Sequence, residues 1–252
     1  MQKIALPKKI EFKKNKEEEN RGEVIVNPLY PGYGTTIGNV LRRVLLSSLP
    51  GAAPIGVKIK GVSHEFMAQP NIKEDVLELI LNIKELKLKV FSEEIVKLEL
   101  KAHGTKEVKA RDIKKNSDVE IINKDLIIGN ITDMFGNLEM EIFVKQGMGY
   151  EMSENREEKS KEIGYIEIDS VYTPVLSVGI ENENVRVGKM TNWDSLILDI
   201  KTDGTITPEE AFYKAVDILM EQFGALLKKE EKKKDKKEEK AEKAEKKDKK
   251  TK

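Results

Sequence analysis

The residues that could perform chemistry in this sequence are few and scattered. His64 and His103 lie far apart, and the chain contains no cysteine, which excludes a structural zinc site of the usual Cys/His kind. Ser47 and Ser48 have no histidine close by in sequence to act as the base that a serine nucleophile needs. We therefore expect no catalytic residue, no cofactor and no metal site in this chain.

A glycine pattern at residues 32–38, GYGTTIG, stands before an expected helix, where a dinucleotide-binding turn would place its glycines. Pro28 and Pro31 interrupt the strand that should lead into such a turn. Residues 53–60 offer no acidic side chain at the distance where a ribose ligand would bind. We favour the alternative, in which the glycines allow a tight turn and close packing of the helix.

The segment TTIGNVLRRVLLSS, Thr35 to Ser48, predicts a helix from about Thr36 to Ser48 with two unlike faces. One face forms an apolar stripe wide enough to pack on a core, made of Ile37, Val40, Leu41, Val44 and Leu45. The opposite face carries Asn39, Arg42, Arg43 and Leu46. An apolar residue beside two arginines indicates a partner surface, and the alternative is a solvated pair that the helix dipole favours.

A second helix is predicted near the C-terminus. Thr207-Pro208-Glu209-Glu210 is a capping box with proline at the first helical position. Apolar residues then recur at spacings of four and three, at Phe212, Val216, Leu219, Phe223 and Leu226. Ala211, Ile218 and Ala225 widen this arc beyond the stripe of about 100° that one core requires. The helix is therefore either central in its own domain or packed partly on a second subunit.

Most other segments read as strands. Lys8 to Phe12 and Glu23 to Val26 flank a charged turn, and Asn27-Pro28 is expected to end the second strand. From Ile55 onwards apolar residues mostly alternate with polar ones, which is typical of half-buried antiparallel strands. Asp75 to Lys84 is an exception with helical spacing. These patterns predict an α+β fold.

Charge is distributed unevenly although the formal net charge is zero. Residues 228–252 hold 14 of the 45 basic and 8 of the 45 acidic residues, which leaves residues 1–227 with 31 basic and 37 acidic residues. The body is therefore not a basic nucleic-acid binder. The N-terminal segment lacks the apolar core of a signal peptide, and no apolar run is long enough to span a membrane. We expect a cytoplasmic protein.

Several blocks in order along the chain resemble the family of bacterial RNA polymerase alpha subunits, in its N-terminal assembly region. The helical block GYGTTIGNVLRRVLLSS resembles the signature of that family most closely. Further blocks cover most of residues 20–227: GVKIKGVSHEF, EDVLELILNIKEL, DVEIIN, QGMGY, VYTPV and DGTITPEEAF.

The resemblance implies an α+β fold with a discontinuous dimerisation domain, an antiparallel sheet with two main helices, built from residues 1–50 and 174–227. A mostly β domain, residues 51–173, is inserted between them. The dimer interface implied by the two helices comprises Ile37, Leu41, Phe212, Val216, Leu219, Phe223 and Leu226. The same resemblance implies that Asn39, Arg42, Arg43 and Leu46 contact the beta subunit, with Arg43 as an assembly determinant.

The end of the chain departs from the family. Typical members continue through a linker into a C-terminal domain that binds DNA, whereas residues 228–252 are almost only Lys, Glu, Asp and Ala. Such a composition cannot form a core, so we expect a disordered tail without that domain. Its net positive charge predicts at most weak, non-specific contact with DNA.

The function implied by the resemblance is that of a non-catalytic subunit of DNA-directed RNA polymerase, a nucleotidyltransferase complex. Two copies would dimerise and recruit the beta and beta-prime subunits, with omega and sigma in the full complex and no contact with a membrane. A standalone dimeric adaptor outside transcription is the alternative. A nucleotide-dependent enzyme is the weaker competitor, and nucleotide binding by the isolated chain would support it.

Overall fold

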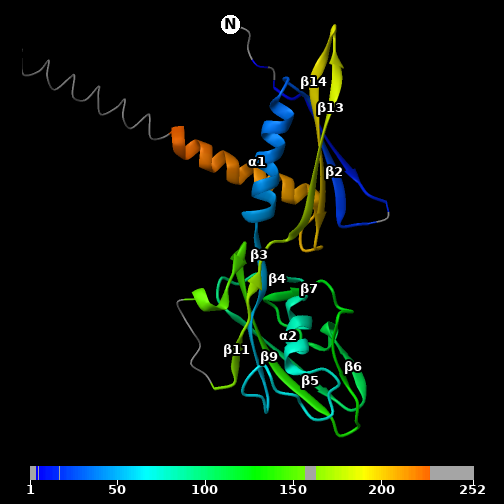
Figure 1. The fold of residues 1–252 in the computed structure, drawn as a ribbon, viewed down its shortest axis with the longest axis vertical. Coiled ribbons are helices and arrows are strands. Elements are labelled where there is room, and N and C mark those ends of the chain that lie inside the picture. The colour runs from blue at the N-terminus through cyan, green and yellow to red at the C-terminus, as the bar shows by residue number, and fades with distance from the viewer. Residues whose placement is uncertain (1–3, 5, 17, 157–162, 228–252) are drawn as a thin grey trace, which may run out of the picture.

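The computed structural model describes residues 4, 6–16, 18–156 and 163–227. The chain forms two units stacked end to end along the long axis of the molecule (Figure 1). One unit is built from both ends of the described chain, and the other from the middle. Strand β3 (Pro50–Ile59) follows the first helix and runs from one unit into the other. Each unit has its own cluster of buried apolar side chains.

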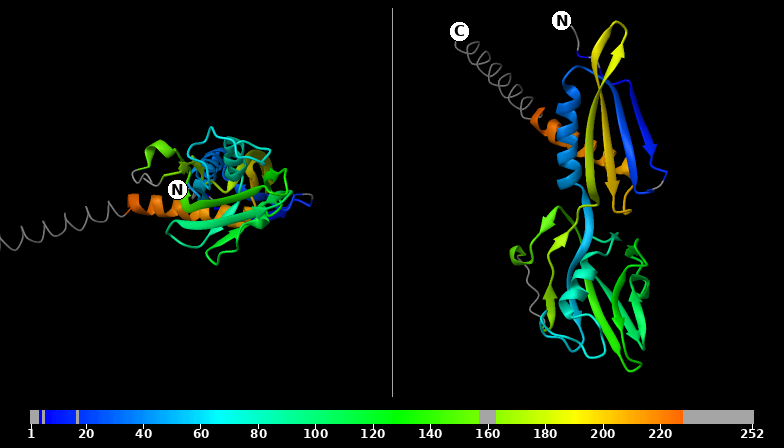
Figure 2. Two further views of the ribbon diagram at one scale, coloured as in Figure 1. Left: turned by 90° about the horizontal axis from the view of Figure 1, so that it is seen from below. Right: turned by 45° about the vertical axis from the view of Figure 1, so that its right-hand side comes forward.

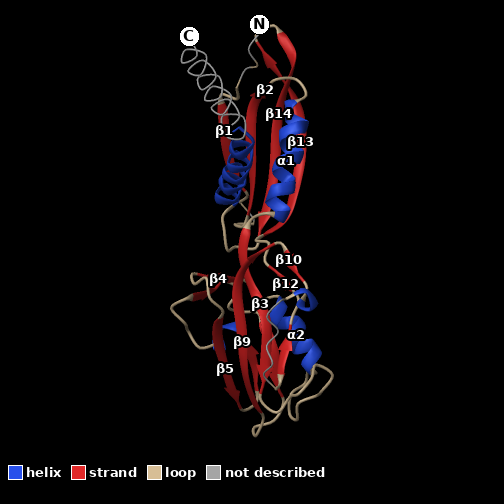
Figure 3. Ribbon diagram, turned by 90° about the vertical axis from the view of Figure 1, so that its left-hand side faces the viewer, coloured by secondary structure: helices blue, strands red, loops and turns tan. Residues whose placement is uncertain are grey.

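The first unit contains an antiparallel sheet in the order β1-β2-β14-β13. Its strands are β1 (Lys9–Lys14), β2 (Arg21–Leu29), β13 (Val175–Val187) and β14 (Met190–Thr202). Helix α1 (Tyr33–Ser47) and the C-terminal helix, residues 208–227, lie against the same face of this sheet (Figure 3). Helix α1 contacts β13 and β14, whereas Phe12 of β1 packs against Phe212 at the start of the C-terminal helix, 5.9 Å between ring centroids.

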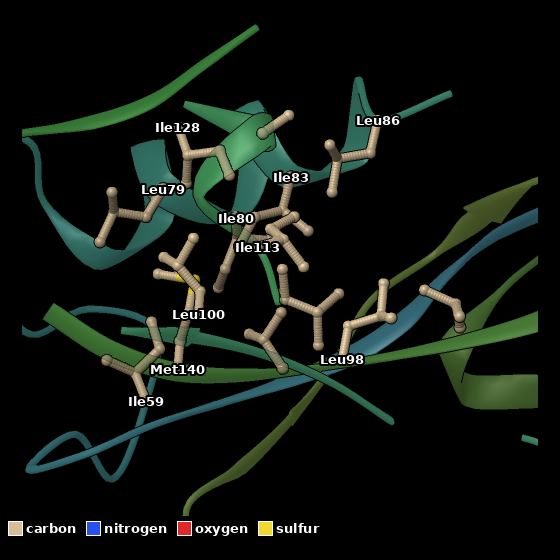
Figure 4. Packing of buried hydrophobic residues seen from close by; sticks show 14 of the residues in the cluster. Ile59, Leu79, Ile80, Ile83, Leu86, Leu98, Leu100, Ile113, Ile128 and Met140 are labelled. Carbon is tan, nitrogen blue, oxygen red and sulfur yellow. The ribbon is translucent and has the colours of Figure 1, made fainter. Parts of the chain in front are cut away.

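The second unit contains a sheet in the order β11-β3-β9-β5 with helix α2 and smaller hairpins around it (Figure 2). Helix α2 (Val76–Lys84) packs on the core that Figure 4 shows, where its Leu79 and Ile83 are fully buried. The remaining strands are β4 (Leu88–Val90), β5 (Val96–His103), β6 (Lys106–Lys109), β7 (Val119–Ile121), β8 (Ile127–Ile131), β9 (Asn137–Met148), β10 (Tyr150–Glu151), β11 (Tyr165–Glu167) and β12 (Ser170–Val171). Two short 3₁₀ helices are η1 (Ala110–Asp112) and η2 (Ser153–Asn155).

The junction between the units brings together two sequence blocks that lie far apart. The ring of Tyr172 lies against Gly147, where a side chain would have no room, and its amide donates to the carbonyl of Gly149. The hydroxyl of Tyr172 donates to Glu151 over 2.7 Å, and burial raises the pKa of Tyr172 to about 12. The blocks QGMGY and VYTPV therefore pack against each other beside the first residues of β3.

The predicted α+β class is confirmed, and so are most local patterns. In β9 the alternating apolar residues are buried along the strand, as the period of two predicts. Asp75 caps α2 by accepting the amide of Glu78 over 2.7 Å. The capping box of the C-terminal helix forms in both directions, between Thr207 and Glu210. The domain boundaries at residues 50 and 173 stay a prediction. Residues 228–252, which were expected to form a disordered tail, lie outside the described residues.

Two boundaries were wrong. Strand β2 does not end at Asn27-Pro28 but continues to Leu29. It does so through a bulge, since Asp194 pairs with Leu29 and Leu196 with Val26, so that Asn27 and Pro28 oppose Ser195 alone. A bulge tolerates proline because no ladder hydrogen bond is required there. Helix α1 also begins at Tyr33, three residues before the predicted Thr36.

Candidate assembly surfaces

The inner face of α1 lies unusually close to the sheet. Its buried residues are Gly34, Gly38, Leu41 and Leu45. A Cβ atom at Gly38 would stand 2.8 Å from Cδ1 of Leu196, and one at Gly34 would overlap the side chain of Asn182. The glycines therefore serve close helix packing, the interpretation favoured over a dinucleotide-binding turn.

The predicted apolar stripe was placed slightly wrongly on α1. Val40 is 37% exposed, and Ile37 and Val44 are only partly buried. The reason is that Gly34 and Gly38 lack side chains and let their side of the helix approach the sheet, so that the buried stripe includes Gly38 and leaves Val40 outside it. Val40 consequently joins the outer surface of α1.

On the outer face of α1, most of the residues predicted to contact the beta subunit are exposed to solvent. Asn39, Arg42 and Arg43 are exposed, while Leu46 is partly buried against the core of the first unit. No ion pair joins Arg42 or Arg43 to another described residue. The hydroxyl of Ser47 donates to the carbonyl of Arg43 over 2.7 Å, so this serine has an ordinary role within the helix.

Sequence reasoning missed the residue that fixes the start of α1. The carboxylate of Asp194, 5% exposed, accepts the amides of Gly32 over 2.9 Å and of Gly34 over 3.0 Å. These are the orphan donors of the first helical turn, and α1 has no local side-chain cap. A carboxylate there also suits the helix dipole. Because Asp194 is some 160 residues away in sequence, no local signal could reveal it.

We expect Asp194→Ala to loosen the first turn of α1. The substitution leaves the buried amide of Gly34 without a partner, which costs about 1–3 kcal/mol in the free energy of unfolding. Chemical denaturation monitored by circular dichroism measures this loss. Asp125→Ala is the matched control, because that side chain is 86% exposed and its loss should change stability by less than about 0.5 kcal/mol. Equal stability of both variants would contradict a capping role for Asp194.

The C-terminal helix changes character along its length. Ala211, Phe212 and Ala215 are buried in the core of the first unit, and the following turn is partly buried. Beyond it the apolar side chains are open, with Met220 66%, Phe223 54%, Leu226 65% and Leu227 67% exposed. Figure 1 shows this end of the helix projecting past α1, away from the sheet. We call these four residues the helix-end patch.

The seven residues predicted for a dimer interface therefore divide into three groups. Leu41 and Phe212 are 3% and 4% exposed, so the chain's own core occupies them and they have little surface left for a partner. Ile37, Val216 and Leu219 are partly buried at the edge of that core. Phe223 and Leu226 lie in the helix-end patch. The first half of the helix packs on the chain's own sheet and the second half is exposed, whereas the predicted interface included residues from both halves.

The residues first considered for catalysis are not brought together. His64 lies in the loop after β3, and His103 ends β5. Within the described ranges no three His, Asp or Glu side chains cluster in a way that could hold a metal ion. Nor does any described helix combine the length and apolar character needed to cross a bilayer.

Comparison with known proteins decides the family. Residues 57–173 match the family model described as RNA polymerase Rpb3/RpoA insert domain. A DNA-directed RNA polymerase subunit alpha from Macrococcus caseolyticus is 46% identical over 213 residues, which are 84% of this chain and 68% of that protein. Those from Clostridium kluyveri and Clostridium botulinum are 48% and 47% identical over 215 residues, 85% of this chain and 68% of each relative. The chain belongs to the DNA-directed RNA polymerase alpha subunit family.

Membership in the alpha subunit family agrees with the architecture. The insert-domain match covers most of the second unit, from within β3 to just before β13. The relatives' shared name makes transcription by DNA-directed RNA polymerase the process to which this chain belongs. The resemblance noted in the sequence is thereby confirmed at the level of the family.

Proposed function

We propose that the chain is a homodimeric scaffold on which the beta and beta-prime subunits of RNA polymerase assemble. The observation that carries this proposal is that the first unit has two solvent-exposed surfaces, the helix-end patch and the outer face of α1. The helix-end patch is apolar, while the outer face of α1 carries two arginines. Each suits a different kind of protein contact, and family membership supplies the context.

The helix-end patch is the proposed dimer contact. Each fully buried large apolar side chain contributes about 1.5–3 kcal/mol, so four such residues on each copy provide a strong driving force for association. An isologous contact uses the same surface on both copies, which a projecting apolar helix end permits. Ile37, Val216 and Leu219 border the patch as partly buried apolar residues, and we propose that they complete the interface.

The outer face of α1 is the proposed contact for the beta subunit. Asn39, Arg42 and Arg43 point away from the sheet that the buried face of α1 covers, so binding there would leave the fold undisturbed. Arginine suits such a contact because its planar guanidinium binds carboxylate or carbonyl groups in fixed geometry. Leu46, partly exposed beside them, adds apolar surface.

In this proposal the reaction itself belongs to the large subunits. The chain contributes no catalytic residue, and omega and sigma join the full complex. Its place would be the cytoplasm, where transcription takes place in bacteria. Residues 228–252, with a net positive charge, would add only weak and salt-sensitive attraction to DNA.

Co-purification of a tagged copy from its own cells tests the proposal. A polymerase scaffold must bring down two chains far larger than itself. The alternative, a dimeric adaptor outside transcription, would purify without them. Nucleotide binding by the isolated chain would instead favour the enzyme considered from the glycine pattern.

A further inference from the structure

A groove of about 490 Å³ lies on the second unit, and none of the residues that line it belongs to either proposed assembly surface. Its floor is apolar: Leu98, Ala110 and Ile113 are buried beneath it, and Figure 4 shows Leu98 and Ile113 in the core cluster. Phe91, which follows β4, forms part of the wall and is 63% exposed. An exposed aromatic side chain next to an apolar floor offers an anchoring place for another apolar group.

The rim of this groove is basic. Arg111, Lys114, Lys115 and Lys124 line it, against a single acidic residue, Glu120. Arg111 and Lys114 form exposed ion pairs, both 3.5 Å, with Asp125 and Glu99. Neither Lys115 nor Lys124 forms an ion pair with any residue in the described part of the chain. The positive charge left unpaired on the rim is therefore that of Lys115 and Lys124.

This local charge is opposite to that of the surrounding body. Residues 1–227 carry 31 basic and 37 acidic residues, so the net charge of the body is negative, whereas the groove lining holds four basic residues and one acidic residue. The same argument excludes the chain's own residues 228–252 as the occupant, because their net charge is positive. Charge complementarity therefore requires an acidic partner.

The form of the groove indicates what kind of acidic partner fits. The side chains of Arg111 and Lys114 are 60% and 75% exposed, so these cations stand in water and cannot enclose a small anion. A single-stranded nucleic acid needs a series of aromatic platforms, and Phe91 is the one aromatic residue in the lining. A peptide with both acidic and apolar side chains satisfies the rim and the floor together.

We propose that this groove binds an acidic, amphipathic peptide segment of another protein. Apolar side chains of the segment lie on the floor beside Phe91, and its carboxylates face Lys115 and Lys124. The surface is distinct from the helix-end patch and from the outer face of α1, so the segment binds the assembled dimer as well. Affinity falls with added salt, because the rim charges are exposed and screened.

The test uses the full chain and a fluorescein-labelled synthetic peptide in which glutamate and aspartate alternate with leucine and phenylalanine. Fluorescence anisotropy measures its affinity for the wild type and for Lys115→Glu with Lys124→Glu. We expect the double variant to bind at least about tenfold more weakly. The control, Lys145→Glu with Lys189→Glu, reverses two exposed lysines elsewhere and should bind like the wild type.

Phe91→Ser provides a second variant that keeps all charges, and it should also weaken binding because the apolar wall is lost. Circular dichroism and sedimentation verify that each variant keeps its fold and its oligomeric state. The proposal is overturned if the wild type shows no saturable binding, or if all variants bind equally. It is also overturned if a single-stranded DNA oligonucleotide binds the groove more tightly than the peptide.

Discussion

Replacing Phe223 and Leu226 by aspartate is expected to convert the proposed homodimer into a folded monomer. Both side chains are more than half exposed in the isolated chain, so the substitutions leave its own core intact. In a dimer they would place charges where two large apolar groups otherwise contribute about 1.5–3 kcal/mol each. We therefore expect the dissociation constant to rise by at least about a hundredfold. Sedimentation equilibrium measures it directly.

The matched control for this experiment is Met134→Asp with Phe135→Asp. These residues are 82% and 93% exposed at a loop of the second unit, so the control also replaces two exposed apolar side chains by carboxylates. It should sediment as a dimer. If the chain with substitutions at Phe223 and Leu226 remained a dimer, the interface would have to lie outside the helix-end patch.

Arg43→Ala is expected to leave the dimer intact and to impair capture of the beta subunit. Arg43 is exposed and forms no ion pair within the described part of the chain, so truncation costs the fold little. Loss of one partner from a charged hydrogen bond in a desolvated interface costs about 2–5 kcal/mol. A pull-down of purified beta subunit by the tagged variant measures the effect, with circular dichroism as the check on folding.

Two further variants show what kind of contact Arg43 makes. Arg43→Lys keeps the charge but loses the planar fork, and we expect only partial recovery of beta capture. Arg186→Ala removes an exposed arginine on β13 and should capture beta like the wild type. Undiminished capture by Arg43→Ala would make Arg43 a solvated surface residue, and loss of the dimer would make it a structural one.

Local chemistry explains why much of the fold could be predicted from the sequence. Alternation along β9 and helical spacing along α2 each depend on neighbours within a few residues, and the caps at Asp75 and Thr207 lie beside the helices they start. The two faces of α1 were predicted in part: Leu41 and Leu45 are buried and both arginines are exposed, as their preference for water indicates, whereas Val40 was placed on the wrong face.

The features that were missed depend on residues distant in sequence. Asp194, which caps α1, belongs to β14, and the bulge at Asn27-Pro28 exists only because β14 pairs with β2. The apolar arc of the C-terminal helix could not be divided from sequence, since Phe212 and Phe223 occupy the same side of the helical pattern. Only the folded structure shows that the sheet covers Phe212, whereas the helix continues beyond the sheet at Phe223.

The native mass of the complex that co-purifies with a tagged copy of this chain tests the scaffold most directly. We expect a particle that contains two copies of the chain together with one beta and one beta-prime subunit. We also expect that the helix-end variant, Phe223→Asp with Leu226→Asp, fails to yield this particle. A particle with a single copy of the chain, or a dimer that purifies without the large subunits, would contradict the proposed scaffold role.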